Sequence, residues 1–126
     1  MSWQTYVDSN LVGTGKIAKA AILGQDGYTW ATTPGFSISI DEGLQLMAGF
    51  DDAGPLRLDG LYAQGERYCD LKADERSVYG RRGTCGIVCV KTGRAVMVGV
   101  YDEGMHPGMA ASVVEGLADY LIGCGY

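Results

Sequence analysis

The sequence predicts an α+β fold, with a central antiparallel sheet covered by helices. Apolar residues recur at helical spacing near both ends of the chain, and short strand-like runs joined by tight-turn residues lie between them. Connections this short suit antiparallel neighbours and not parallel crossovers. The predicted order of helix, two strands, helix, about five strands and helix therefore favours an α+β architecture. We expect a single domain over residues 1–126, with the two terminal helices on one face of the sheet.

The first part of the chain is predicted to form a helix followed by a hairpin. The helix is expected over residues 3–12, because Ser2 suits its N-cap and the Gly-Thr-Gly segment at 13–15 stops it. Strands are expected over residues 18–24 and 28–32. Asp-Gly between two apolar runs is a strong hairpin signal, so these two strands are predicted to pair directly.

The remaining chain is predicted to contain a capped helix, a run of strands and a final helix. Ser39 and Glu42 have the spacing of a capping box, which opens a helix that ends at residues 51–55. Turn residues, including a turn expected at 80–83, separate the strand-like runs that follow. These runs cover residues 56–62, 67–73, 77–79, 85–91 and 95–101. Apolar residues at helical spacing predict the last helix over residues 109–122.

Composition and charge narrow the possible classes of function. The chain is 47% hydrophobic and 20% charged, which is typical of a soluble globular protein and too apolar for disorder. A net charge of -5 argues against general nucleic-acid binding. The longest apolar run, at residues 95–100, is too short to span a bilayer, and no secretory signal is visible. We therefore expect a protein of the cytosol or nucleus with free thiols.

One stretch of the chain reverses the overall sign of the charge. Residues 67–94 contain seven basic and three acidic residues, a net charge of +4, so the rest of the chain carries -9. Basic residues gathered in an acidic protein predict a recognition surface for an acidic partner. The alternative is a solvated sheet surface whose charges have no partner.

Few residues are suited to catalysis. His106 is the only histidine, so a site with two histidines is excluded and Ser or Cys nucleophiles have one possible imidazole base. The acidic pairs at 51–52 and 74–75 lie in predicted turns, which favours a role in turn formation over acid–base chemistry. The cysteines lack the spacing of a zinc site and are expected to be small apolar fillers: Cys69, Cys85, Cys89 and Cys124. We expect no enzymatic activity, no metal and no cofactor.

Aromatic residues indicate a binding surface instead. Trp and Tyr combine a flat apolar face with a polar tip, which suits partly exposed positions. If the terminal helices are neighbours, five such residues form one shallow cluster: Trp3, Tyr6, Trp30, Tyr120 and Tyr126. Polyproline II helices dock on aromatic grooves of this kind at a low entropic cost. The alternative is that both tryptophans are core residues and that the C-terminal tyrosine is a frayed end.

Several motifs, in order along the whole chain, resemble the profilin family. They are the segments at 2–8 (SWQTYVD), 11–15 (LVGTG), 30–31 (WA), 73–80 (ADERSVYG) and 117–123 (LADYLIG). The sequence looks most similar to the fungal and amoeboid branch, and its length and element order match as well. The resemblance implies a sheet with the terminal helices on one face and shorter helical segments on the other.

The resemblance also implies a function in the actin cytoskeleton of the cytoplasm. Profilins bind monomeric actin, regulate its polymerisation and nucleotide exchange, and deliver it to proline-rich proteins such as formins. They also bind phosphoinositides such as phosphatidylinositol 4,5-bisphosphate. A chain similar to them is expected to be a monomeric, non-enzymatic adaptor with two separate protein-binding faces and no nucleic-acid partner.

Matching motifs imply the residues of each face. The five aromatic residues are expected to bind polyproline, with Tyr120 in place of the histidine of other branches. The expected actin contacts are Arg67, Lys72, Arg81, Arg82, Thr84, Gly86, Met105, His106, Gly108 and Ser112. The expected phosphoinositide contacts are Lys72, Arg76, Arg81 and Arg82, so that actin and lipid would compete. Gly116 and Asp70 depart from the pattern that the resemblance leads us to expect, and they are predicted to lower actin affinity.

Two other classes of function stay open from the sequence alone. A small-ligand sensor domain has the same general architecture, without actin binding, and would require a closed apolar pocket. A redox enzyme using Cys85 or Cys124 would require a thiol with a lowered pKa.

Overall fold

The computed structural model describes residues 2–126 and is built around one seven-stranded sheet. The strands lie in the order β2-β1-β7-β6-β5-β4-β3, and every neighbouring pair is antiparallel. Their bounds are β1 (Lys19–Gly24), β2 (Thr29–Thr32), β3 (Leu61–Ala63), β4 (Glu66–Ala73), β5 (Ser77–Arg82), β6 (Cys85–Lys91) and β7 (Ala95–Tyr101). The predicted α+β class with a central antiparallel sheet is confirmed.

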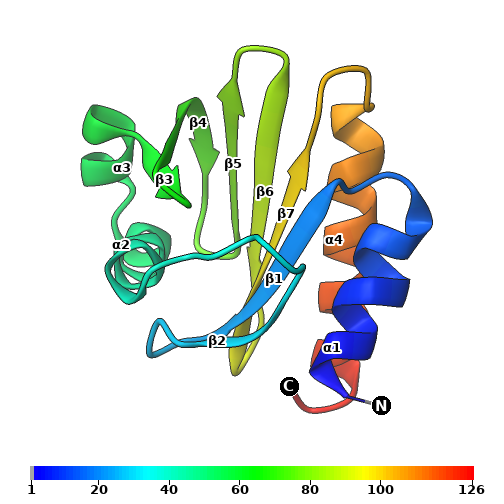
Figure 1. Ribbon diagram of the computed structural model, residues 1–126. Helices are drawn as coiled ribbons and strands as arrows, with labels where there is room; N and C mark the ends of the chain where they lie inside the picture. Colours follow the sequence, from blue (N-terminus) through cyan, green and yellow to red (C-terminus); the bar gives the residue numbers. More distant parts are fainter. Residues whose placement is uncertain (1) are drawn as a thin grey trace.

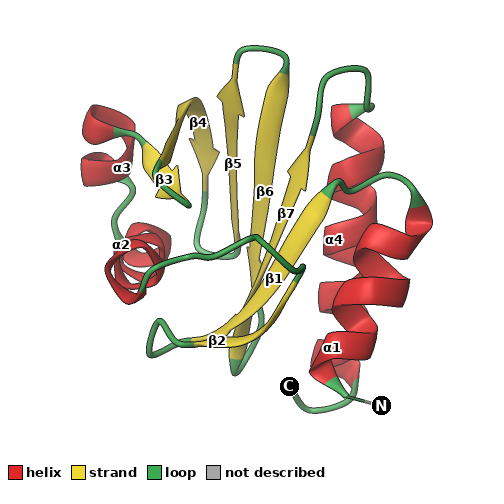
Figure 2. Cartoon of the chain, viewed as in Figure 1, coloured by secondary structure: helices red, strands yellow, loops and turns green. Residues whose placement is uncertain are grey.

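Helices lie on both faces of this sheet. They are α1 (Trp3–Thr5), the π-helix η1 (Tyr6–Leu11), the 3₁₀-helix η2 (Val12–Thr14), α2 (Ile40–Asp51), α3 (Gly54–Asp59) and α4 (Pro107–Gly123). Figure 1 shows α1 beside α4 on one face, and Figure 2 shows α2 and α3 on the other. The predicted placement of the helices is therefore confirmed. None of the helices in residues 2–126 is long and apolar enough to cross a membrane.

Two apolar cores result from this arrangement, one on each face of the sheet. Side chains alternate between the faces along a strand. In β6, Val88 belongs to the core beneath α4, whereas Ile87 and Cys89 belong to the core beneath α2 and α3. Helix α4 approaches the sheet closely at Gly99, where an added Cβ would lie 2.8 Å from Val114 Cγ2. The position of α4 is thus fixed by close packing as well as by apolar burial.

Two predicted helix starts are confirmed in atomic detail. Ser2 Oγ accepts a hydrogen bond from the Thr5 N–H (3.2 Å). Ser39 and Glu42 form the predicted capping box, in which each side chain accepts the other residue's N–H (3.1 and 3.0 Å). Glu42 also accepts N–H bonds from the β3–β4 turn (3.0 and 2.8 Å). This carboxylate therefore joins the start of α2 to the sheet.

The predicted strand over residues 56–62 is wrong, because a short helix occupies most of this segment. Apolar and polar residues alternate there as in a strand, but Pro55 stands in the first turn of α3. Asp52 Oδ1 also accepts a hydrogen bond from the Gly54 N–H (3.0 Å), which favours the helix start. Gly60, with a φ of 91°, ends the helix, and only β3 is left as a strand.

The turn predicted at residues 80–83 is wrong at its start. Strand β5 continues to Arg82, and only Gly83, with a φ of 62°, adopts a left-handed turn conformation. Gly80 lies inside the strand. A glycine suits this position, because side-chain atoms of Leu71 and Tyr68 lie 2.8 and 3.0 Å from where a Cβ would be. Neighbouring strand residues point to opposite faces, so the two arginines at the end of β5 do not share a face.

Candidate functional site

The five predicted aromatic residues meet at the end of the molecule where both chain termini lie (Figure 1). The Trp3 ring centre lies 4.9 Å from that of Trp30 and 5.2 Å from that of Tyr126. Tyr6 joins them, 5.8 Å from Trp3 and 6.3 Å from Tyr120. Trp30, Tyr120 and Tyr126 are 40%, 54% and 42% exposed, and the other two rings are half-buried. These residues, called the aromatic cluster below, form one continuous and partly exposed surface.

The N-terminal half of the aromatic cluster is positioned by two residues that sequence reasoning missed. Gln4 Nε2 donates a hydrogen bond to the Thr32 carbonyl (2.9 Å), which ties α1 to β2 and brings Trp3 against Trp30. Gly24 leaves space for the indole, because an added Cβ would lie 2.7 Å from Trp30 Nε1. A glycine inside a strand pattern is the one signal that pointed to this close approach.

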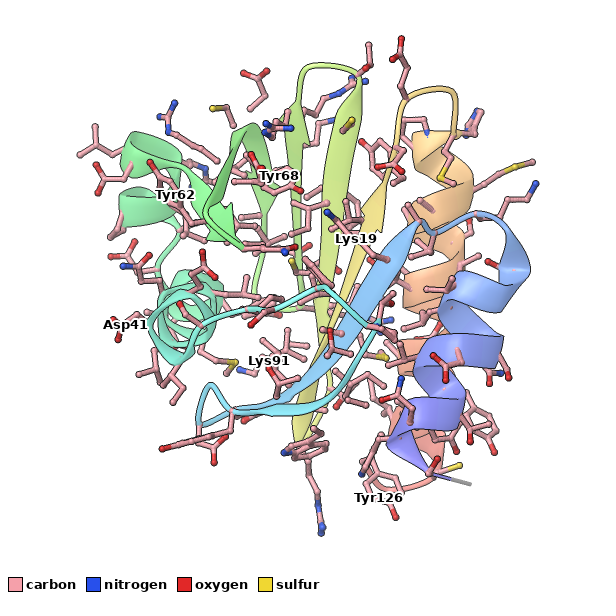
Figure 3. The ribbon with its side chains drawn as sticks, viewed as in Figure 1. Lys19, Asp41, Tyr62, Tyr68, Lys91 and Tyr126 are labelled. Carbon is pink, nitrogen blue, oxygen red and sulfur yellow. The ribbon has the colours of Figure 1, made fainter. Side chains whose placement is uncertain are left out.

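The C-terminal tyrosine of the cluster is held by backbone hydrogen bonds. The Tyr126 carbonyl accepts bonds from Thr92 Oγ1 (2.8 Å) and from the Arg94 N–H (2.6 Å). The Tyr126 N–H donates to the Leu121 carbonyl (2.9 Å), and Figure 3 shows the ring beside the start of the chain. Thr92, in the β6–β7 turn, is only 4% exposed. Tyr126 is therefore an ordered part of the surface and not a frayed end.

A groove of about 330 Å³ runs between η1 and α4 and shares Tyr6 and Tyr120 with the aromatic cluster. Its other lining residues are Asn10, Thr14, Val113, Gly116 and Leu117. An added Cβ at Gly116 would have no heavy atom within 4 Å, so the glycine leaves the groove open. The structure thus places Gly116 beside the predicted proline site.

The chemistry of the aromatic cluster suits an uncharged, ridged ligand. Indole N–H groups donate hydrogen bonds, and tyrosine hydroxyls donate or accept them. A hydrogen bond with the neighbouring Cys124 raises the pKa of the Tyr120 hydroxyl above its ordinary value of 10. Like any tyrosine at neutral pH, Tyr120 is protonated and can donate. A polyproline II helix matches this surface, because it presents apolar ridges and carbonyl acceptors without proline N–H donors.

A second set of predicted residues lies at the other end of α4. In Figure 1 the start of α4 and the β5–β6 turn lie at the same end of the molecule, away from the termini. His106 caps α4, because its Nδ1 accepts the N–H groups of Gly108 and Met109 (3.1 and 3.3 Å). The name basic end is used below for this region together with Lys72, which lies on the same face of the sheet but toward the β4–β5 turn. Its residues are Lys72, Arg81, Thr84, Met105, His106, Gly108 and Ser112.

The two cations of the basic end lie on the same face of the sheet as α4. Lys72 pairs with Tyr79 across β4 and β5, and the Tyr79 hydroxyl reaches Glu115 of α4. Arg81 lies two residues further along β5, so its side chain points to that same face. Both cations are exposed. They therefore offer exposed positive charge on the face of the sheet that carries α4, with Arg81 toward the β5–β6 turn and Lys72 toward the β4–β5 turn.

The other predicted actin contacts have structural partners. Gly86 is buried, and an added Cβ would collide with the Tyr101 ring. Arg82 forms an ion pair with Glu66 (2.6 Å) and points away from the face that carries Arg81. Arg67 Nε donates to a backbone carbonyl at the end of α3 (2.8 Å). The structure thus places these three positions near the basic end without joining them into its exposed surface.

Arg76, at the β4–β5 turn, is bound by two carboxylates of α4. Its Nη2 lies 3.0 Å from Glu115 Oε1 and 2.8 Å from Asp119 Oδ1. Glu115 also accepts hydrogen bonds from the Ser77 and Tyr79 hydroxyls. Burial and the Glu115 carboxylate raise the pKa of Tyr79 to about 12. Arg76 therefore links the start of β5 to α4, and the basic stretch of the sequence does not form one surface.

The two alternative classes of function gain little from this geometry. Burial raises the pKa of the Cys89 thiol, which makes it a poor nucleophile. Cys85 lies at the start of β6 and Cys124 beside the aromatic cluster, so these two thiols lie at opposite ends of the molecule. The groove between η1 and α4 is lined mostly by exposed or half-buried residues, whereas a small-ligand sensor needs a closed pocket. Residues 2–126 contain no group of three or more His, Cys, Asp or Glu that could hold a metal ion.

Comparison with known proteins agrees with this geometry. The family model described as Profilin matches residues 1–126. Profilin-2 of Acanthamoeba castellanii is 55% identical to this chain over 126 residues, and the aligned residues cover 100% of both proteins. The crystal structure of A. castellanii profilin II has a TM-score of 0.97 at 54% identity, covering 99% of this chain and 100% of that one. Mouse profilin IIa, in complex with a double repeat from the FH1 domain of mDia1, has a TM-score of 0.80 at 23% identity over 100% of both chains, a likeness of fold alone.

Proposed function

The chain belongs to the profilin family, and we propose that it binds monomeric actin and proline-rich segments at opposite ends of one domain. In this function it regulates actin polymerisation and nucleotide exchange as a non-enzymatic adaptor of the cytoplasm. The aromatic cluster carries the proposal, because it combines five adjacent rings with a C-terminal tyrosine held by hydrogen bonds. Helix α4 has 17 residues and spans about 25 Å, so the two ends are far enough apart to hold two partners.

Proline-rich segments are the proposed ligands of the aromatic cluster. The rings lie edge-on or tilted to one another and leave flat apolar faces between them. Such faces accept the ridges of a polyproline II helix, which is already extended in solution and loses little entropy on binding. The FH1 repeat in the complex with mouse profilin IIa supports a formin as the class of partner.

Monomeric actin is the proposed partner of the basic end. Actin is an acidic protein, and the exposed Lys72 and Arg81 supply complementary charge for association. Thr84, His106 and Ser112 add polar groups that suit the rim of a protein interface. The buried Gly86 contributes by leaving room for the Tyr101 ring, and we do not assign it a direct contact.

Phosphoinositide headgroups are proposed to bind at the basic end as well. Lys72 and Arg81 are exposed on one face of the sheet, whereas Arg82 points to the other face and shares its charge with Glu66. Arg76 is left out of this set because two carboxylates already neutralise its charge. Since phosphates and actin would then use the same cations, lipid and actin are expected to compete.

A tryptophan-fluorescence titration with a proline decamer tests the proposed function. Both tryptophans belong to the aromatic cluster, so ligand binding changes the surroundings of an intrinsic probe. We expect a saturable change with the decamer and none with a glycine–serine peptide of equal length. A folded sample that shows neither a fluorescence change nor heat of binding by calorimetry would contradict the proline site.

Nucleotide release from actin monomers tests the other end of the molecule. Actin loaded with a fluorescent ATP analogue is mixed with the protein, and the rate of nucleotide exchange is followed. We expect a faster rate that saturates with protein concentration. An unchanged rate, together with no complex by sedimentation, would contradict actin binding while leaving the proline result intact.

A further inference from the structure

A second groove, of about 440 Å³, lies between α2 and α3 on the face of the sheet that α4 does not cover. Helix α2 lines it from Asp41 to Asp52, which is a length of about 16 Å along the helix axis. Asp59 of α3 and Tyr62 of β3 form the opposite side. Figure 3 shows Asp41 and Tyr62 on this side of the molecule, away from Tyr126. The groove contains no residue of the aromatic cluster or of the basic end.

The floor of this groove is apolar and fixed by close packing. An added Cβ at Gly49 would collide with the Leu56 side chain, so α2 and α3 are in direct contact there. Leu56 is 4% exposed and also belongs to the core beneath these helices. Ala48 lines the groove above this contact and is exposed. The groove is thus already formed and has apolar surface left for a partner.

The rim of the groove carries carboxylates that have no cationic partner. Asp41, Asp52 and Asp59 are exposed, and none of them takes part in an ion pair formed within residues 2–126. Residues 40–63 contain five acidic residues and one arginine, a net charge of -4, whereas the whole chain carries -5. The negative charge of the protein is therefore concentrated around an apolar groove.

Large apolar side chains are exposed beside the carboxylates. Leu44 of α2 is 46% exposed, Leu58 of α3 is 80% exposed, and Tyr62 is 37% exposed. Of these three side chains Tyr62 lines the groove, whereas Leu44 and Leu58 are single exposed apolar side chains outside its lining, which are common on protein surfaces. The Tyr62 ring also offers a face on which an ammonium or guanidinium group can rest.

We propose that this acidic groove is a third interaction surface, which binds a short basic segment of a partner protein. Charge complementarity selects lysine or arginine side chains, and the apolar floor selects aliphatic side chains between them. An extended chain advances about 3.3 Å per residue, so five residues match the 16 Å length of the groove. A segment with a basic residue at each end and in the middle places its cations near Asp41, Asp52 and Asp59.

An NMR titration of the ¹⁵N-labelled protein tests the proposal. The probe is the acetylated peptide Lys-Leu-Lys-Leu-Lys-amide at low ionic strength, and the control is the same peptide with Glu in place of Lys. We expect saturable shifts of amide signals within residues 41–62, and no such shifts with the control. Shifts spread evenly over the surface, or equal shifts with the control peptide, would overturn the proposal.

Two matched triple variants show whether the groove or the overall charge attracts the peptide. Asp41→Asn, Asp52→Asn and Asp59→Asn together remove three charges at the rim and should weaken peptide binding about tenfold. The control variant removes three exposed charges elsewhere, through Asp8→Asn, Asp26→Asn and Asp102→Asn. Its affinity for the peptide should change less than about twofold. Equal weakening in both variants would overturn the proposal.

A single substitution tests the apolar floor. Ala48→Lys places a cation inside the groove, and a surface helical position tolerates lysine. We expect this variant to lose the peptide-induced shifts at residues 41–62 while it keeps proline-decamer binding, which reports an intact fold. Undiminished peptide binding by this variant would contradict occupation of the groove. Because the readouts are separate, failure of this proposal leaves the proline and actin results unaffected.

Discussion

The two ends of α4 present surfaces that are built in different ways. At the aromatic end, rings from α1, η1, β2, α4 and the C-terminus lie against one another, and hydrogen bonds to its backbone hold Tyr126. At the basic end, Lys72 and Arg81 extend singly into solvent. The first surface is preformed, so a ligand loses little entropy on binding there, whereas the second acts mainly through charge. Mutations should therefore change binding strength at the aromatic end, and association rate and salt dependence at the basic end.

The largest effect is expected from Trp3→Ala. Trp3 contacts three other rings of the aromatic cluster and so occupies its centre. Central aromatic residues of interfaces commonly contribute about 2 kcal/mol or more, so proline-decamer affinity should fall about thirtyfold or more in a calorimetric titration. Actin affinity should stay within about twofold. Tyr62→Ala removes an exposed ring on the other face of the sheet and serves as the control, with circular dichroism to verify folding.

Charge reversal at Arg81 and at Arg76 tests whether the position of a cation, or only the summed charge of residues 67–94, determines actin binding. Arg81→Glu should weaken actin binding about tenfold and lower the association rate, since a like charge would then face an acidic partner. Arg76→Glu makes the same change in charge but places it against Glu115 and Asp119, so it should lower thermal stability instead. Stopped-flow binding and thermal melts distinguish the two effects. An equal loss of actin binding in both folded variants would show that summed charge matters and position does not.

A smaller effect on the aromatic end is expected from Gly24→Ala. The added methyl group would lie 2.7 Å from Trp30 Nε1, and the rigid indole must move to accept it. Edge-to-face aromatic contacts are worth about 0.5–1.5 kcal/mol, so proline affinity should fall about three- to tenfold. Calorimetry measures the change, and Tyr62→Ala, on the other face of the sheet, is again the control. Unchanged affinity in Gly24→Ala would show that the Trp30 position is not critical.

The ion pair and hydrogen bonds of Glu115, which join β5 to α4, should affect stability more than binding. Glu115→Gln removes the charge that faces Arg76 and should lower the free energy of unfolding by about 1–2 kcal/mol in urea titrations. Glu66→Gln breaks the more exposed pair with Arg82 and should cost about 0.5 kcal/mol or less. Equal losses in the two variants would contradict a special role for the Glu115 hydrogen bonds.

The smallest effect is expected at Asp74, in the β4–β5 turn. The N–H groups of Ser77 and Arg76 donate to its carboxylate and hold the pKa below its ordinary value of 3.8. Because the pKa is lowered in the folded state, this stabilisation is present above the unfolded pKa and is lost as the pH falls through the folded value. Asp74→Asn should therefore lose less stability than the parent protein on acidification below about pH 4. Parallel acid-denaturation curves would contradict this.

Local signals predicted the aromatic end well. Motifs along the chain contain four of the five rings, all but Tyr126, and the helical period placed Trp3 one turn before Tyr6. The residues that hold the rings, Gln4 and Thr92, act through backbone carbonyls distant in the sequence. No sequence pattern records which carbonyl lies within reach, so their roles became visible only with the fold. The capping box at Ser39 was predictable because all its partners lie within three residues.

The basic end was harder to predict because charge was summed along the sequence. Arg76 and Arg81 are five residues apart, yet the first is neutralised by α4 and the second is exposed. Strand alternation also separates Arg81 from Arg82, which the turn predicted at 80–83 had placed together. The helix α3 was not predicted, because Leu56 and Leu58 alternate with polar residues as in a strand. Pro55, which favours the first turn of a helix, was the stronger signal.

The central claim is that the two ends of α4 bind their partners independently. The most direct measurement is the affinity for fluorescently labelled actin monomers with and without a saturating concentration of proline decamer. We expect affinities that agree within about twofold and a ternary complex in analytical ultracentrifugation, because the ends lie about 25 Å apart. Displacement of actin by the decamer would contradict two separate surfaces and would place both ligands on one site.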